Sequence, residues 1–219
     1  MASNAVPDFL PSRYGFKFAN RWPRSVARRW HLGLLEVGIG DVSRGLCGGM
    51  AFAARDRFER GEPGPGETEP PPQGSALFRE IVDRQFDSFG SLFVVPLRFW
   101  LSSAFGNGAS RGRETVRKAW PAIRADIDAG RPAMIGLVRE AGRNPLTLGM
   151  GHQVAGYRYE TTADGVSIAA YDPNHPGKDD VELRFERRPG GEIRHFQSTG
   201  EPLLGLLSLP WKPPRSRAG

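Results

Sequence analysis

The stretch SRGLCGGMAFAARDRF, residues 43–58, contains Cys47, the only cysteine of this 219-residue chain. Its apolar residues recur at helical spacing, at Met50, Ala54 and Phe58. We therefore expect an amphipathic helix that Ser43 caps, that carries Cys47 at its start and that ends near Gly61. The question is why a lone thiol stands at that position.

A thiol at a helix N-terminus is suited to nucleophilic chemistry. The free amide groups and the helix dipole lower the thiol pKa and so favour the reactive thiolate. Gly48 and Gly49 leave the backbone beside the sulfur bare, so that their N–H groups could approach a developing oxyanion. The alternative is structural: Cys47 is a small buried hydrophobe and the glycines allow close helix packing. This stretch alone leaves both interpretations open.

Two downstream stretches supply candidate partners for the thiol. GHQVAGYRYE, residues 151–160, begins a predicted strand with His152, and VSIAAYDPNHPG, residues 166–177, ends an apolar strand at Asp172. If the two strands are antiparallel neighbours, the two residues lie at adjacent ends and the carboxylate can orient the imidazole. The structural alternatives are a core or surface histidine and an ordinary Asp-Pro turn.

The pattern of apolar residues predicts an α+β fold, helical first and sheet-forming second. The first 20 residues are turn-rich and predicted to be irregular. Besides the cysteine helix, helices are predicted over residues 22–38, 75–89 and 113–129, the last with Pro121 unexplained inside it. Short alternating runs predict antiparallel strands at 131–140, 151–160, 166–173 and 180–187.

The chain length fits a single domain. We expect this domain to span residues 1–210, with a Pro/Gly-rich surface loop at about 61–74. Residues 211–219, WKPPRSRAG, are predicted to form a disordered basic tail.

Composition excludes several classes of protein. A single cysteine rules out an internal disulfide framework, and with only 4 scattered histidines we expect no metal site and no cofactor. The net charge of +6 comes from arginines spread along the chain, without a nucleic-acid-binding motif. The apolar run at 91–105 is interrupted by Pro96 and Arg98 and is too short to span a bilayer. No secretory signal is visible, so we expect a soluble protein that is cytoplasmic or exported without an N-terminal signal peptide.

Three stretches, GLCGGMAF, GHQVAGY and YDPNHPG, together resemble the papain-like cysteine peptidase superfamily. Within it, the chain is most similar to poorly characterised bacterial relatives of the bacteriocin-processing transporter peptidase domains. RQFDSF (84–89) and AGRPAMIGLV (129–138) extend the resemblance, which covers about residues 15–185. It implies a papain-like fold in which the helical N-terminal part carries the cysteine at a helix start and the C-terminal antiparallel sheet carries the histidine and the aspartate.

The resemblance also implies roles for individual residues. Cys47 would be the nucleophile, His152 the general base and then acid, and Asp172 the orienting group, with Asn174 as the alternative third member. One position departs from the family pattern. Papain-like peptidases usually place an oxyanion-binding glutamine six residues before the cysteine, and here Asp41 stands there, whose carboxylate would repel an oxyanion. Candidate replacements as oxyanion donors are Gly48, Asn20 and Gln153.

The sequence therefore predicts a cysteine hydrolase, foremost a peptidase acting on a peptide or protein through a thioester acyl-enzyme. A thiol acyltransferase or amidase would use the same triad. The departure at Asp41 and the spread of arginines motivate a second alternative, a catalytically weak or inactive papain-like module that binds a peptide, protein or anionic partner. The sequence does not predict an oligomeric state.

Overall fold

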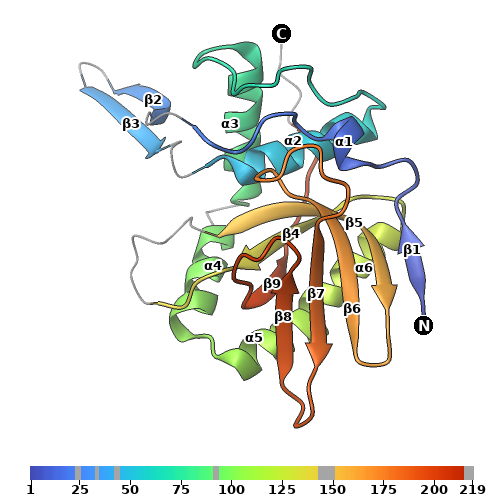
Figure 1. Ribbon diagram of the computed structural model, residues 1–219. Helices are drawn as coiled ribbons and strands as arrows, with labels where there is room; N and C mark the ends of the chain where they lie inside the picture. Colours follow the sequence, from blue (N-terminus) through green and yellow to red (C-terminus); the bar gives the residue numbers. More distant parts are fainter. Residues whose placement is uncertain (23–25, 33–34, 42–44, 91–93, 143–150, 215–219) are drawn as a thin grey trace.

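The computed structural model describes the chain except residues 23–25, 33–34, 42–44, 91–93, 143–150 and 215–219, and describes residues 26–32 and 35–41 by their backbone only. The fold is α+β, as predicted, with helices and a curled antiparallel sheet (Figure 1). The sheet order is β8-β7-β6-β5-β4-β9, and β1 pairs with the far half of β5. These strands are β1 Ser3–Ala5, β4 Ala133–Val138, β5 His152–Thr161, β6 Gly165–Tyr171, β7 Glu182–Arg187, β8 Ile193–Gln197 and β9 Gly205–Ser208.

The helices form two groups around this sheet. α1, α2 and α3 lie at one end of the sheet, and α4, α5 and α6 lie along one of its faces (Figure 1). The buried core is continuous from the first group through the sheet to the second. The bounds of the helices are α1 Pro11–Tyr14, α2 Cys47–Glu59, α3 Ala76–Ser88, α4 Val94–Phe105, α5 Gly108–Glu114 and α6 Trp120–Asp128.

The predicted strands over 131–140, 151–160, 166–173 and 180–187 are confirmed as β4 to β7, and each neighbouring pair in the order β4-β5-β6-β7 is antiparallel. The strands β1, β8 and β9 were not predicted. β1, like α1, lies in the segment expected to be irregular, and both are only a few residues long. Short elements whose pairing partner is far away in sequence leave little periodic signal.

The helix predicted over 75–89 is confirmed as α3, which Ser75 caps by accepting a hydrogen bond from Phe78 N–H at 3.1 Å. The helix predicted over 113–129 is confirmed as parts of α5 and α6, joined by a π-helical turn over Thr115–Ala119. Trp120 N–H binds Thr115 O, five residues back. This wider turn explains Pro121, because proline has no N–H and its ring would collide with the preceding turn of a regular α-helix.

The helix predicted over 22–38 is wrong. Residues Val26–Leu32 and Leu35–Asp41 form β2 and β3, an antiparallel pair separate from the large sheet (Figure 1). Val37, Gly38 and Ile39 are weak helix formers, and β-branched residues favour extended backbone. These extended strands therefore replace the predicted helix in the described part of this segment.

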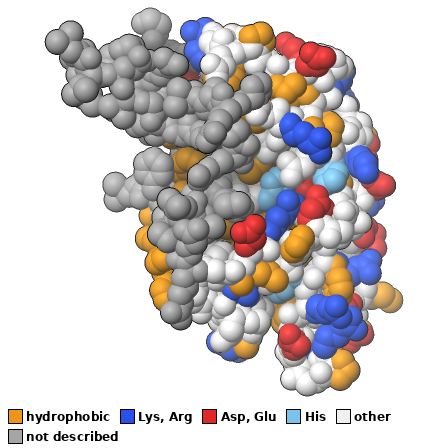
Figure 2. Space-filling view, turned by 60° about the vertical axis from the view of Figure 1, so that its left-hand side comes forward, with side chains coloured by type: hydrophobic (Ala, Val, Ile, Leu, Met, Phe, Trp, Pro, Cys, Tyr) orange, Lys and Arg blue, Asp and Glu red, His pale blue; other side chains and the backbone are white. Residues whose placement is uncertain are grey.

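The apolar run at 91–105 forms α4 in its described part. Among the described residues, no helix has both the length and the apolar character needed to cross a membrane. Acidic and basic side chains are interspersed over the coloured part of the face shown in Figure 2. The arginine side chains therefore form no single positively charged patch on that part of the surface.

The Pro/Gly-rich segment at 61–74 has no helix or strand, as expected. It packs back on the N-terminal segment, where Gly64 N–H donates to Arg13 O at 2.8 Å. The prediction of a disordered tail from residue 211 is wrong for its first residues. Trp211 Nε1 donates to Asp56 Oδ1 at 2.9 Å, and Arg84 donates to Lys212 O at 2.9 Å. A large aromatic ring with a buried partner cannot stay in solvent as a basic tail would; residues 215–219 lie outside the description.

The start of α2 lies directly against α3. A Cβ added to Gly49 would stand 2.0 Å from the backbone oxygen of Ile81, and a Cβ on Gly48 would stand 2.3 Å from Ser88 Oγ. The close packing proposed as the structural interpretation of the glycine pair is therefore present. It explains the glycines, while the thiol beside them needs a separate explanation.

We predict that Gly49→Ala destabilises the protein by about 1–3 kcal/mol, because backbone atoms cannot move aside to relieve the contact. The matched control is Gly66→Ala in the loop, where an added Cβ meets nothing within 4 Å. Urea unfolding of both variants measures the effect. Equal midpoints for the two variants would contradict the packing interpretation.

Candidate active site

Cys47 is the first residue of α2, and two side chains accept hydrogen bonds from backbone N–H groups at this helix end. The first four N–H groups of a helix lack intrahelical acceptors. Asn20 Oδ1 accepts from Leu46 N–H at 2.6 Å, and Gln85 Oε1 accepts from Gly49 N–H at 2.8 Å. No oxygen of the described residues accepts from the N–H of Cys47 or Gly48. Two amide donors beside the sulfur are thus left for a ligand.

The cap predicted for α2 is different from the one observed. Leu46 occupies the N-cap position and makes no side-chain cap, and Ser43 lies outside the described residues. Asn20 provides the capping oxygen instead, from a segment that precedes β2. Its Oδ1 also accepts from Trp22 Nε1 at 3.0 Å, so the amide is fixed in this orientation.

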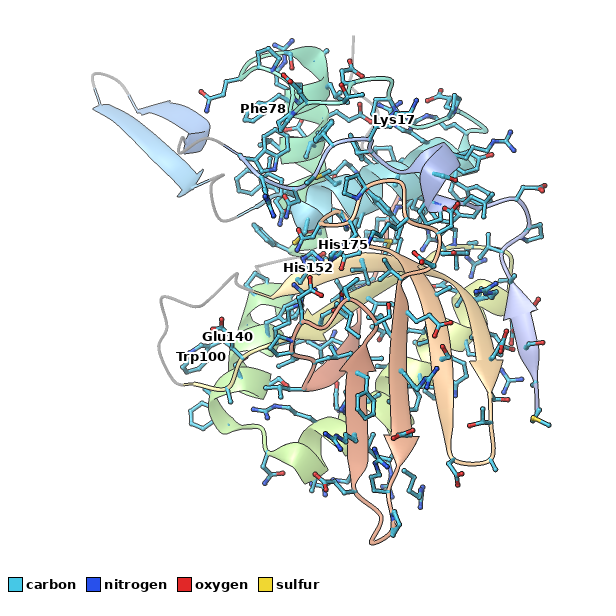
Figure 3. The ribbon with its side chains drawn as sticks, viewed as in Figure 1. Lys17, Phe78, Trp100, Glu140, His152 and His175 are labelled. Atoms are coloured by element: carbon cyan, nitrogen blue, oxygen red, sulfur yellow. The ribbon has the colours of Figure 1, made fainter. Side chains whose placement is uncertain are left out.

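His152 is the first residue of β5 and is buried. Figure 3 shows it at the junction between the helices and the sheet. The preceding residue, Gly151, also contacts the site, because its backbone oxygen lies 3.9 Å from Cys47 Sγ. Gly151 is held there by Phe99 of α4, whose ring would stand 2.3 Å from a Cβ at that position. The start of β5 thus places His152 beside the thiol.

Asp172 follows β6 and is fully buried. His152 Nε2 and Asp172 Oδ1 are 2.6 Å apart, the length of a charge-assisted hydrogen bond. The strands that carry them, β5 and β6, are antiparallel neighbours, with Ala155 paired to Tyr171. The structure thus brings together the two residues that the predicted strand order placed at adjacent ends.

The other predicted site residues lie nearby but contact different atoms. Asn174 is not the hydrogen-bond partner of His152: its backbone N–H donates to Asp172 Oδ1 at 2.9 Å, and its Oδ1 accepts from Asn20 Nδ2 at 3.3 Å. The Gln153 side chain is buried behind Gly48, where its Nε2 donates to Ser88 Oγ at 3.2 Å. Asp41 ends β3, and its side chain lies outside the description. Among the three candidate oxyanion donors, Gly48 alone has its donor group without a partner among the described residues.

The ionisable groups of the site shift one another's pKa values toward the charged forms. Burial by itself raises the pKa of the Cys47 thiol, but His152 and the backbone of Gln153 outweigh burial and lower it. Burial by itself lowers the pKa of His152, yet the charges of Asp172 and Cys47 raise it to about 9. Burial opposes ionisation of Asp172 as well, and His152, Asn174 N–H and Arg139 nevertheless lower its pKa to about 2. Near neutral pH these shifts favour a thiolate, an imidazolium and a carboxylate.

Two residues of this site were missed by the sequence analysis. Gln197 Nε2 donates to Asp172 Oδ2 at 2.9 Å, and an Arg139 NH2 group lies 3.5 Å from the same oxygen. Gln197 ends β8, a strand that was not predicted, so nothing in the sequence indicated where it lies. Arg139 was the one available signal, since a charged residue follows the apolar run of β4.

Comparison of the chain with protein-family models, with curated proteins and with solved structures gave no match. Within the described part of the chain, no three His, Cys, Asp or Glu side chains come together as a metal site. What the site offers is a thiol at a helix N-terminus, free amide donors beside it, and a histidine bound to a buried carboxylate.

Proposed function

We propose that the protein is a papain-like cysteine hydrolase that cleaves peptide bonds with Cys47 as nucleophile, His152 as proton carrier and Asp172 as orienting group. The observation that carries the proposal is the contact of His152 with Asp172 at 2.6 Å beside the only thiol of the chain. A structural cysteine needs no such histidine, and a structural histidine needs no thiol at a helix start.

The contact between His152 and Asp172 supports different roles for the two histidine nitrogens. Nε2 faces Asp172, and an ionised carboxylate has no proton to donate, so Nε2 carries the proton of this hydrogen bond. Nδ1 is then the nitrogen that exchanges a proton with Cys47. In the resting protein the proton sits on the imidazole and the sulfur is a thiolate.

The reaction follows from this arrangement. The thiolate attacks the peptide carbonyl carbon, and the N–H groups of Cys47 and Gly48 stabilise the oxyanion. The C–N bond breaks as the amine takes the proton from His152, which leaves a thioester on Cys47. A water molecule then loses a proton to His152 and attacks the thioester, and the acid product leaves while the thiolate is regenerated. Amine transfer in place of water would make the same site an acyltransferase.

The proposal predicts fast alkylation of Cys47 below neutral pH. An ordinary thiol with a pKa near 8.5 is about 0.3% thiolate at pH 6, whereas the lowered pKa of Cys47 keeps the thiolate present as the pH falls. At pH 6, iodoacetamide should label the wild type on the order of 100 times faster than His152→Ala. Because the chain has 1 cysteine, intact mass reports this site alone.

His175→Ala is the matched control, because the backbone N–H of His175 donates to Asp172 O at 2.9 Å, but its side chain pairs with Glu201 at 2.8 Å. This variant should label like the wild type. Equally slow labelling of the wild type and of His152→Ala at pH 6 would mean that no ion pair forms, and the proposed hydrolase would have to be abandoned in favour of a binding module.

A further inference from the structure

The carboxylate of Asp172 is held from the side away from His152 by a second pair of side chains. Gln197 Nε2 donates to Asp172 Oδ2 at 2.9 Å, and Gln197 Oε1 accepts from an Arg139 NH2 group at 3.0 Å. Gln197 is buried, and the Arg139 side chain is 16% exposed. The proposed reaction moves no proton or bond at either residue, so their presence around the carboxylate needs its own reason.

The donors and acceptors of this cluster permit one arrangement. A guanidinium only donates, so the amide oxygen of Gln197 must face Arg139. The amide NH2 then faces Asp172 Oδ2, which must accept. A protonated Oδ2 would meet the NH2 group donor to donor, so this arrangement disfavours a proton there.

The same cluster balances the charges of the site. Cys47 thiolate and Asp172 carboxylate make two negative charges, while imidazolium supplies one positive charge. Arg139, 3.5 Å from Asp172 Oδ2, supplies the second. Without it, the buried site would hold an uncompensated negative charge, and the group that neutralises most readily would take a proton.

We propose that Arg139 and Gln197 are positioning residues of the site: Arg139 sets the orientation of the Gln197 amide, and Gln197 keeps Asp172 ionised and in line with His152. This inference rests on the proposed function. Neither residue touches the reacting atoms; both act through the carboxylate.

Gln197→Glu tests the inference, because it replaces the NH2 donor by oxygen without changing the side-chain size. Two carboxylates 2.9 Å apart cannot both ionise, so they share a proton and the support for the imidazolium weakens. The rate of Cys47 alkylation by iodoacetamide, measured from pH 4 to 9, should then show its inflection at higher pH. At pH values below the inflection, a displacement of about one pH unit corresponds to a roughly tenfold slower reaction.

Gln73→Glu makes the same charge change in the exposed loop and should leave the pH profile in place. Circular dichroism and thermal unfolding show which variants are folded. Because the buried change could prevent folding, Arg139→Met serves as a second variant at a more exposed side chain, and it should displace the profile in the same direction.

The outcomes separate the inference from the function on which it rests. A low-pH inflection in the wild type that moves upward in the folded variants supports the positioning role. A low-pH inflection that stays in place in a folded variant overturns the positioning role and leaves the hydrolase intact. An ordinary thiol profile in the wild type overturns the hydrolase and the positioning role together.

Discussion

Cys47→Ala should lose all peptide cleavage while remaining folded. Removing the nucleophile from a catalytic triad costs on the order of 10⁶ in kcat, because nothing else can form the acyl-enzyme. The fold should tolerate the change, since Gly48 and Gly49 make the close contacts at this helix end. Cleavage of fluorescently labelled casein and of a mixed peptide pool, read by mass spectrometry, measures the loss.

Carbamidomethylation of the wild type provides a control that needs no mutation. One modification at the single cysteine should remove the same activity as the alanine variant, without any change of the backbone. Residual cleavage by folded Cys47→Ala at the wild-type rate would show that the activity belongs to another site. A wild type that cleaves neither substrate would contradict the peptidase proposal itself.

The sequence predicted an element correctly where the residue pattern of one short stretch is enough to identify it. The alternating runs at 151–160 and 166–173 predicted β5 and β6, and antiparallel neighbours necessarily bring the start of one beside the end of the other. That single step brought His152 to Asp172 from 20 residues away. The presence of α2 was likewise predictable from the spacing of Met50, Ala54 and Phe58, although the N-cap is Leu46 and not Ser43.

Prediction from the sequence failed where a residue's role depends on a contact with a distant segment of the chain. The sequence places Gln85 in the helix predicted over 75–89, and only the packing of α3 on α2 shows that its side chain accepts from Gly49 N–H. Asn20 was named as an oxyanion donor, but its oxygen caps Leu46 N–H. Gln197 depends on the position of β8 in the sheet. No periodicity of the chain encodes these side-chain contacts.

A second large loss of activity is expected when the carboxylate of the proposed triad is replaced by an amide. The variant Asp172→Asn makes this change. Besides His152, the described residues that bind this carboxylate are fixed donors: Asn174 N–H at Oδ1, and Gln197 Nε2 with Arg139 at Oδ2. An asparagine must turn its own NH2 group toward one of these sides, so a donor meets a donor in either orientation.

If the asparagine NH2 group faces His152, Nε2 must accept, and the imidazole proton moves to Nδ1, beside the thiol. A histidine in that tautomer cannot take the thiol proton, and a comparable substitution in a serine protease triad costs about 10⁴ in kcat. We expect Asp172→Asn to lose activity by about this factor and to alkylate slowly at pH 6, because His152 loses the charge that raises its pKa. Asn174→Asp, two positions away, is the matched control and should retain most of the activity, because that side chain is not the hydrogen-bond partner of His152. Comparable losses in the two variants would indicate that the carboxylate merely stabilises the loop, since an orienting role requires the effect to be specific to residue 172.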